Sequence, residues 1–233
     1  MIIKVDDKPI ELHGGASVSI DEVYAAVTET NAKLRSLERR TEEMAFNIFE
    51  AIDFRMLSGL VGETLVTELA KGTETLEKNP NIDGYPDLVN ISKLAYKTNF
   101  EEWRQANLEE FINFSHGGIE IKNTFGTKLS NVTLRPGDTR IKNISKKPAW
   151  KAHHRYTNHL LALLSDFIEG CPQIVAAMYS DELVENDWSE KQDPKKGSTM
   201  TSFSVIQSSG WEKLKRRVLI CNEDLPYKSY FGI

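Results

Sequence analysis

Two short segments of the sequence carry acidic and basic residues at spacings that could do chemistry. Asp87 follows Pro86 at the beginning of a strand-like run, and Glu120 and Lys122 lie two positions apart in a second strand-like run, 119–124. Residues i and i+2 of a β-strand point from the same face, so Glu120 and Lys122 project together while their apolar neighbours pack behind them. If the two strands are neighbours, the three charged groups meet in one place.

Such a group of residues fits the hydrolysis of a phosphodiester bond. That reaction needs a water made nucleophilic near neutral pH, relief of negative charge at phosphorus and stabilisation of the leaving alkoxide. Mg²⁺ supplies most of this, and it needs only one or two protein carboxylates because it keeps several waters. We therefore expect Asp87, Glu120 and the main-chain carbonyl of Ile121 to bind Mg²⁺, with Lys122 over the attacking water.

The same residues carry a resemblance to a known family. Pro86-Asp87 in one strand and Glu120-Ile121-Lys122 in the next resemble the signature of the PD-(D/E)xK nuclease superfamily, which includes many type II restriction endonucleases. The resemblance implies that Asp87 and Glu120 bind Mg²⁺ and that Lys122 orients or deprotonates the water. Each motif taken alone has a commoner explanation, a turn residue after proline or a solvated ion pair on a strand.

The resemblance also suggests a third acid. Many members of the superfamily add a glutamate from a helix that precedes the Asp strand, and Glu63 in the expected helix 57–71 matches that position. Glu68 on the same helix competes with it. A polar residue on the flank of a helix more often faces solvent.

The hydrophobic pattern predicts the elements that position these residues. Residues 1–12 are typical of a β-hairpin, and residues 21–58 of a helix long enough to be a helical hairpin or to contact a partner. We expect the later elements in this order: helix 57–71, strands 87–91 and 119–124, helix 151–169, and strands 173–179 and 217–221. This order predicts an α/β fold, a mixed central β-sheet flanked by helices with a long N-terminal helical region, which the resemblance makes restriction-endonuclease-like.

We expect two regions within this fold. The length of 233 residues fits one medium domain, with room for a small appendage. Residues 1–56 form an N-terminal hairpin and helical region, a candidate dimerisation surface. Residues 57–233 form the nuclease core with its DNA-binding elements.

The distribution of basic residues along the sequence is a better indicator of DNA binding than their total number. The net charge of −5 argues against nucleic acid, yet the segment 140–155 has several bases and no acid. Its expected helix start at 151 would also offer N–H groups to phosphate. We expect DNA contacts from Asn123, Thr124, Arg140, Lys142, Lys146, Lys147, Lys151, His154, Arg155, Lys195, Lys196, Ser198 and Thr199. The alternatives are strand termination after Lys122, a solvated charged face at 140–155 and a mobile linker around 195–202.

Other features narrow the class of protein. Cys171 and Cys221 show no zinc-ligand spacing, so we expect reduced, packed thiols. No apolar run approaches the roughly eighteen residues of a membrane span, and we expect a cytoplasmic protein without a membrane partner. The sequence contains no GxxxxGK[ST] loop, so we expect no use of ATP.

Together these features predict a Mg²⁺-dependent, site-specific deoxyribonuclease. The resemblance implies a type II restriction endonuclease, a homodimer that cuts double-stranded DNA at a palindromic sequence. Two alternatives stay open. One is a repair or recombination nuclease of the same superfamily, and the other is a non-catalytic DNA-binding or assembly protein that uses the helix at 21–58.

Overall fold

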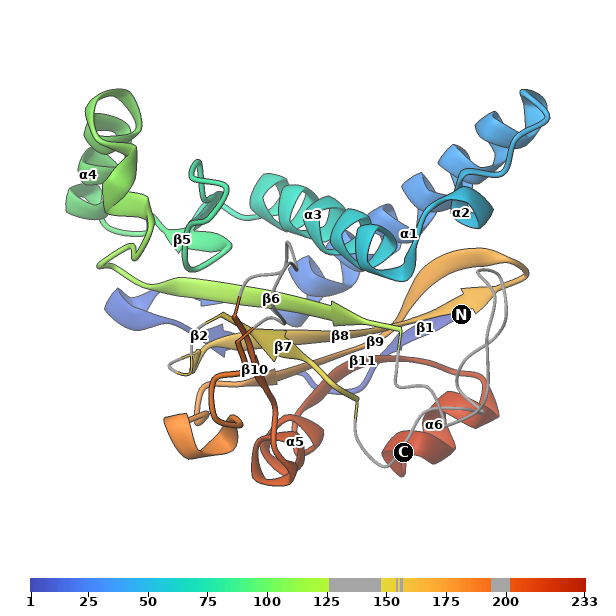
Figure 1. Ribbon diagram of the computed structural model, residues 1–233. Helices are drawn as coiled ribbons and strands as arrows, with labels where there is room; N and C mark the ends of the chain where they lie inside the picture. The colour runs from blue at the N-terminus through green and yellow to red at the C-terminus, as the bar shows by residue number, and fades with distance from the viewer. Residues whose placement is uncertain (126–147, 154, 156, 194–201) are drawn as a thin grey trace.

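A seven-stranded sheet forms the centre of the computed structural model, which describes residues 1–125, 148–153, 155, 157–193 and 202–233 (Figure 1). Among the described strands, β6 and β8 run parallel and the other neighbours in this sheet run antiparallel. In spatial order the strands are β1 (Ile2–Lys4), β11 (Val218–Asn222), β9 (Cys171–Ser180), β8 (Leu160–Ile168), β6 (Gly118–Thr124), β5 (Leu88–Asn90) and β4 (Leu76–Lys78).

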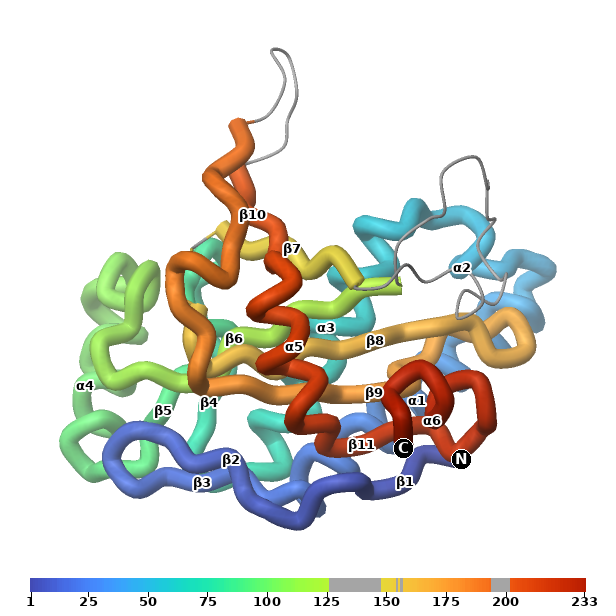
Figure 2. The backbone as a smooth tube through the Cα atoms, turned by 90° about the horizontal axis from the view of Figure 1, so that it is seen from below, coloured from blue at the N-terminus to red at the C-terminus, as the bar shows by residue number. Residues whose placement is uncertain are grey.

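Helices cover both faces of this sheet. One face carries α1 (Ile20–Glu43), α2 (Ile48–Ala51) and α3 (Phe54–Gly72), and the other carries α5 (Ser208–Lys215) and α6 (Leu225–Phe231), as Figures 1 and 2 show. The helix α4 (Leu94–Ala106) and the turn η2 (Leu108–Phe111) are inserted between β5 and β6. The predicted mixed sheet flanked by helices is thus confirmed, with a mostly antiparallel sheet. None of the described helices is long and apolar enough to cross a membrane.

The smaller elements lie outside the main sheet. β2 (Ile10–Glu11) pairs with β3 (Ser17–Val18), with η1 (His13–Gly15) between them. β7 (Lys151–Ala152) pairs with β10 (Ser204–Val205) in a second separate ribbon, which Figure 1 shows below β6. The remaining described element is η4 (Glu185–Asp187).

The predicted helix over 21–58 is two main helices rather than one. Ser19 caps α1 in a capping box with Glu22, and α1 then ends at Glu43. Ala45 adopts a positive φ of 57°, which turns the chain, and the side chain of Asp53 caps the start of α3. The apolar spacing continues across this turn, so periodicity alone could not reveal it. The second long helix is α3, which corresponds to the helix predicted separately over 57–71, so residues 21–58 do not form a helical hairpin by themselves.

The predicted hairpin over 1–12 is wrong, because β1 pairs with β11 rather than with β2. Arg217 explains the separation. Its guanidinium forms an ion pair with Asp6 at 2.8 Å and donates to the main-chain carbonyls of Lys8 and Pro9 at 2.6 and 2.8 Å. These contacts hold the segment after β1 against the beginning of β11, so that β2 starts a separate ribbon.

The predicted helix over 151–169 is also wrong, because this stretch forms β7 and the central strand β8. β8 lies between β6 and β9 and is buried on both faces. Leu161 packs into the core beneath α1 and α3, whereas Leu160 packs toward α5 and α6. A strand apolar on both faces loses the alternation that distinguishes strand from helix.

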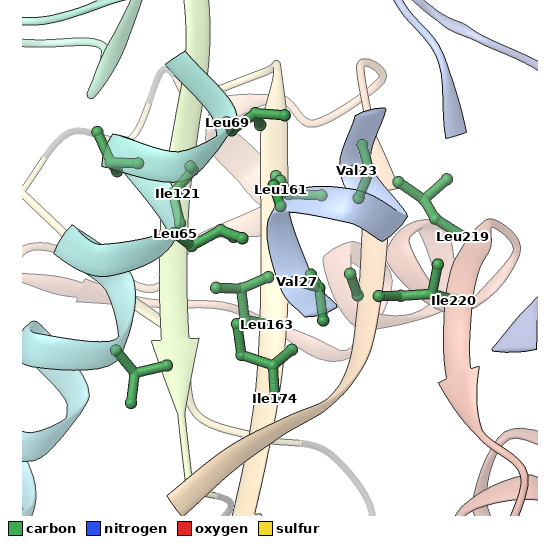
Figure 3. Close-up of a cluster of buried hydrophobic side chains, with 14 of the residues drawn as sticks. Val23, Val27, Leu65, Leu69, Ile121, Leu161, Leu163, Ile174, Leu219 and Ile220 are labelled. Carbon is green, nitrogen blue, oxygen red and sulfur yellow. The ribbon is translucent and has the colours of Figure 1, made fainter. Parts of the chain in front are cut away.

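The hydrophobic core on the α1/α3 side joins the first part of the chain to the rest. Figure 3 shows Val23 and Val27 of α1 next to Leu65 and Leu69 of α3, packed against side chains from the sheet. The labelled sheet residues are Ile121, Leu161, Leu163, Ile174, Leu219 and Ile220. Residues from both predicted regions therefore share one core, and this core fixes α3 over β6.

Candidate active site

The two strands that carry the predicted acids are neighbours. β5 pairs with β6 in antiparallel register, Leu88 with Ile119 and Val89 with Gly118. Gly118 adopts a φ of +152°, and a Cβ atom there would lie 1.8 Å from the carbonyl oxygen of Leu88. Only glycine allows this approach of the two backbones. The expectation that the strands lie side by side is confirmed.

The carboxylate of Asp87 is fixed at the point where the two strands part. Its Oδ2 accepts a hydrogen bond from the main-chain N–H of Ile121 at 2.7 Å. In return, the main-chain N–H of Asp87 donates to Oε2 of Glu120 at 3.2 Å. Two hydrogen bonds between side chain and main chain thus connect β5 and β6 beyond the end of their regular backbone pairing.

Lys122 lies between the two carboxylates. Its ammonium forms an ion pair with Oε1 of Glu120 and lies 3.7 Å from Oδ2 of Asp87. The side chain of Glu120 is only 6% exposed, that of Asp87 27%. The three predicted residues are therefore brought together, partly shielded from water.

Burial sets the ionisation of this group. It raises the pKa of Asp87 to about 7, with Glu120 acting in the same direction and Lys122 opposing it. For Lys122, burial acts to lower the pKa, but the charges of Glu120 and Asp87 outweigh it and hold the pKa above its usual value. When both carboxylates are ionised, the cluster carries one negative charge more than Lys122 balances, and burial makes that charge unfavourable without a further cation.

Asn79 holds the turn that leads into Asp87, and its role was not predicted. Its side-chain amide donates to the carbonyls of Pro86 and Phe111 at 2.9 and 3.0 Å. Its main-chain N–H donates to the carbonyl of Asp87 at 2.9 Å. Asn79 begins an Asn-Pro-Asn segment that marks a turn in the sequence, but that signal does not reveal these longer-range bonds.

Tyr85 was also missed by the sequence analysis. Burial and the nearby charge of Glu120 raise the pKa of its phenol to about 12, while a hydrogen bond to Thr157 acts in the opposite direction. Tyr85 therefore stays neutral near the carboxylates. A tyrosine before Pro-Asp gave no signal that distinguishes this position from an ordinary packed side chain.

A cavity of about 600 Å³ opens beside the charged group, and it is lined by Asp87 and Lys122 but not by the more buried Glu120. It lies between α3, the partly buried end of β6 and the ribbon of β7 and β10. Its lining residues are Arg55, Ser58, Gly59, Gly62, Glu63, Val66, Asp87, Ile121, Lys122, Asn123, Ala149, Lys151, His153 and Phe203. Most of these walls come from segments that the acid motifs do not identify.

The two glutamates that competed for the third acid lie in different surroundings. Glu63 lines the cavity with Asp87 and forms an ion pair with Lys78 at 2.6 Å. Glu68 instead pairs with Lys33 at 2.6 Å and Lys71 at 3.1 Å and is not part of the cavity lining. The position of Glu63 therefore suits a role at the site better.

The residues after the strand motif are partly engaged inside the protein. The amide oxygen of Asn123 accepts from Ser165 at 2.7 Å, and its amide nitrogen donates to the carbonyl of Ser58 at 3.4 Å. Asn123 thereby links β6 to β8 and α3 at the cavity wall. Thr124 is the last residue of β6.

The other residues expected to contact DNA divide into three groups. Lys151 lies in β7 at the cavity, so the helix start expected there is absent. Arg155 pairs with Glu185 at 2.6 Å and Glu190 at 3.6 Å, so acids already neutralise its charge. Outside the described residues lie Arg140, Lys142, Lys146, Lys147, His154, Lys195, Lys196, Ser198 and Thr199.

The donor set fits a hard divalent cation better than zinc. No three His, Cys, Asp or Glu side chains gather as a metal site within the described part of the chain. Mg²⁺ needs fewer protein ligands, since one or two carboxylates and waters suffice. Asp87 and Glu120 supply two carboxylates in contact with a single ammonium, and Ile121 borders the same cavity.

Comparison with family models, curated proteins and solved structures finds no match to this chain. The fold and site define an α/β protein with a charged cavity at the end of a strand pair. Its function therefore has to be inferred from the site itself.

Proposed function

We propose that this chain is a Mg²⁺-dependent DNA endonuclease that hydrolyses phosphodiester bonds. The observation that carries the proposal is the convergence of Asp87, Glu120 and Lys122 where β5 and β6 part, at the side of a cavity of about 600 Å³. Two carboxylates and an amine are the groups that metal-assisted hydrolysis of a phosphate ester requires. Support also comes from the resemblance of these residues to the PD-(D/E)xK signature.

Each residue has a defined part in this proposal. Asp87 and Glu120 hold Mg²⁺ with the main-chain carbonyl of Ile121, and the bound cation would lower the pKa of a coordinated water and neutralise charge on the phosphate. Lys122 stays protonated, because the two carboxylates hold its pKa above the usual value, and it would orient the attacking water rather than deprotonate it. Glu63 assists from α3, across the cavity from the strand motif.

The finer proposal is a type II restriction endonuclease with a restriction-endonuclease-like fold. Such an enzyme acts as a homodimer that places one active site on each strand of a palindromic duplex. The cavity also carries cationic side chains, Arg55 and Lys151, suited to the phosphates that flank the cut.

A cleavage assay with matched variants tests the proposal. Purified protein is incubated with plasmid and phage DNA with and without Mg²⁺, and the ends of the fragments are sequenced. We expect discrete fragments only with Mg²⁺, and a loss of at least about a hundredfold in Asp87→Asn and Lys122→Met. The controls Asp7→Asn and Lys97→Met change exposed residues away from the cavity and should cleave normally.

The other outcomes separate the rival functions. Cleavage confined to forked or damaged DNA, without discrete plasmid fragments, would favour a repair or recombination nuclease. DNA binding by wild type and Asp87→Asn alike, with no Mg²⁺-dependent cleavage by either, would favour a non-catalytic DNA-binding protein. A homodimer in solution is checked separately by light scattering.

A further inference from the structure

Two glycines lie side by side with longer side chains in the wall of the cavity that α3 forms. Gly59 and Gly62 both line the cavity, and a Cβ atom built on either residue meets no other atom within 4 Å. Glycine is unfavourable inside a helix, where alanine would stabilise the fold. Free space beside these glycines is therefore available to a ligand that lies against α3.

The opposite wall is cationic and aromatic. The ammonium of Lys151, in β7, lies 4.2 Å from the ring centroid of Phe203, just before β10. His153 lines the same wall, and its Nδ1 lies 3.2 Å from the carbonyl oxygen of Ser202. In the described part of the chain no carboxylate forms an ion pair with Lys151. Lys151 therefore brings a cation without a carboxylate partner among the described residues to the cavity lining, next to an aromatic face.

These walls match the two parts of a nucleotide. Aromatic side chains stack on the flat face of any base, and lysine and arginine bind phosphate. The volume of about 600 Å³ lies within the range of pockets that enclose small ligands, roughly 300–1,000 Å³. The cavity is open to solvent on one side, and a base that has left the stack can offer its face to Phe203, whereas both faces of a base inside a duplex are covered by its neighbours.

We propose that this cavity binds one unstacked nucleotide of the substrate strand, next to the phosphodiester at Asp87 and Lys122. The base lies against Phe203, the main chain of α3 at Gly59 and Gly62 gives it room, and Lys151 and Arg55 contact its flanking phosphates. This inference rests on the proposed nuclease function. It adds that the substrate must present an unpaired or rotated-out nucleotide.

Binding measurements without cleavage test the inference. Fluorescence anisotropy without divalent cations compares three labelled probes of matched sequence: a single strand, a fully paired duplex and the same duplex with one unpaired nucleotide. We expect the single strand and the interrupted duplex to bind at least about tenfold more tightly than the paired duplex, because unpairing then costs nothing. Equal affinity for the three probes would overturn the proposal.

Substitutions in the cavity give a second, independent readout. Phe203→Leu should weaken binding of the single strand by roughly five- to hundredfold, and Phe203→Trp should restore it, because stacking needs a ring. Gly62→Leu fills the space beside α3 and should weaken binding as well, whereas Gly72→Leu, near the end of α3 and outside the cavity, should not. Unchanged binding in both Phe203→Leu and Gly62→Leu would contradict the proposal.

The melting temperatures of Phe203→Leu and Gly62→Leu are measured as well, so that loss of folding can be excluded as the cause of weaker binding. Gly62→Ala should raise the melting temperature, since alanine favours the helix and its Cβ meets no neighbour. Failure of the inference and of the proposed function are distinguishable. If the wild type cleaves with Mg²⁺ but binds all three probes equally, the proposed function stands and the nucleotide site is refuted. If the wild type prefers unpaired DNA but never cleaves, the nucleotide site stands and the proposed function is refuted.

Discussion

The carboxylate of Asp87 is held by the main-chain N–H of Ile121, at 2.7 Å, where β5 and β6 separate. The bond crosses from one strand to the other at the position where the regular ladder has ended. It fixes the direction of the acid before any ligand binds, which is the preorganisation that catalytic sites require. Residues that preserve the approach of the two strands should therefore matter for activity as well as for stability.

Gly118→Ala should be among the most damaging single substitutions at the site. A Cβ atom there would lie 1.8 Å from the carbonyl oxygen of Leu88, so β5 and β6 must move apart. We expect a loss of at least about 3 kcal/mol in the free energy of unfolding, together with loss of cleavage. Urea denaturation measures the first effect. Gly72→Ala, whose Cβ meets no atom within 4 Å, is the control, and equal stability of the two variants would refute the prediction.

Asn79→Ala should displace Asp87 without touching substrate. The substitution leaves the carbonyl of Pro86 without its side-chain donor and removes one of the two donors to the carbonyl of Phe111, at a cost of about 1–3 kcal/mol in stability. Because the turn holds Asp87, we expect kcat to fall about tenfold or more while KM changes little. Steady-state kinetics on a defined oligonucleotide decide the matter. A variant that loses stability but keeps the wild-type kcat would show that Asn79 is only structural.

Glu63→Gln and Glu68→Gln should have opposite consequences. Glu63 lines the cavity, so its substitution should lower the cleavage rate by about tenfold while leaving stability nearly unchanged. Glu68 pairs with Lys33 and Lys71 away from the cavity, and its loss should cost up to about 1 kcal/mol of stability without affecting cleavage. Parallel cleavage and denaturation assays separate the two. Reduced cleavage in Glu68→Gln alone would reverse the assignment.

Asp187 should make the fold sensitive to acid. Burial by itself raises the pKa of Asp187, but the ammonium of Lys213 at 2.7 Å and the N–H of Val184 outweigh burial and hold the pKa below its usual value. Its contribution to stability is therefore present above about pH 4 and is lost as the pH falls through the lowered pKa. At pH 7, Asp187→Asn should lose about 1–3 kcal/mol.

Wild type and Asp187→Asn also test the direction of this pH dependence. The difference in unfolding free energy between wild type and Asp187→Asn should shrink as the pH is lowered from 7 toward 3. Chemical denaturation at several pH values measures it. A difference that grows on acidification would show that the carboxylate is not stabilised in the folded state.

Local sequence patterns were sufficient for the strands that bear the acids. Alternation places Glu120 and Lys122 on one face of β6, and the proline and turn residues mark the start of β5 beside Asp87. Both features depend only on near neighbours in sequence. The apolar stripe of α3 was predicted for the same reason.

Long-range pairing limited the rest of the prediction. The central strand β8 is apolar on both faces, so its residues carry no alternation that separates it from a helix. The partner of β1 depends on Arg217, far away in sequence. Lys151 and Phe203 come together at the cavity because β7 pairs with β10. The sequence near either residue contains no pattern that predicts this pairing.

The pairing of β1 with β11 has a consequence for how the protein is made. β1 at residues 2–4 pairs with β11 at residues 218–222. These two strands cannot pair until β11 has left the ribosome. Until then, one edge of β9 has no partner strand. Contacts so distant in sequence slow folding and leave backbone groups available to other chains. Synthesis rate and chaperone supply should therefore govern the yield of native protein.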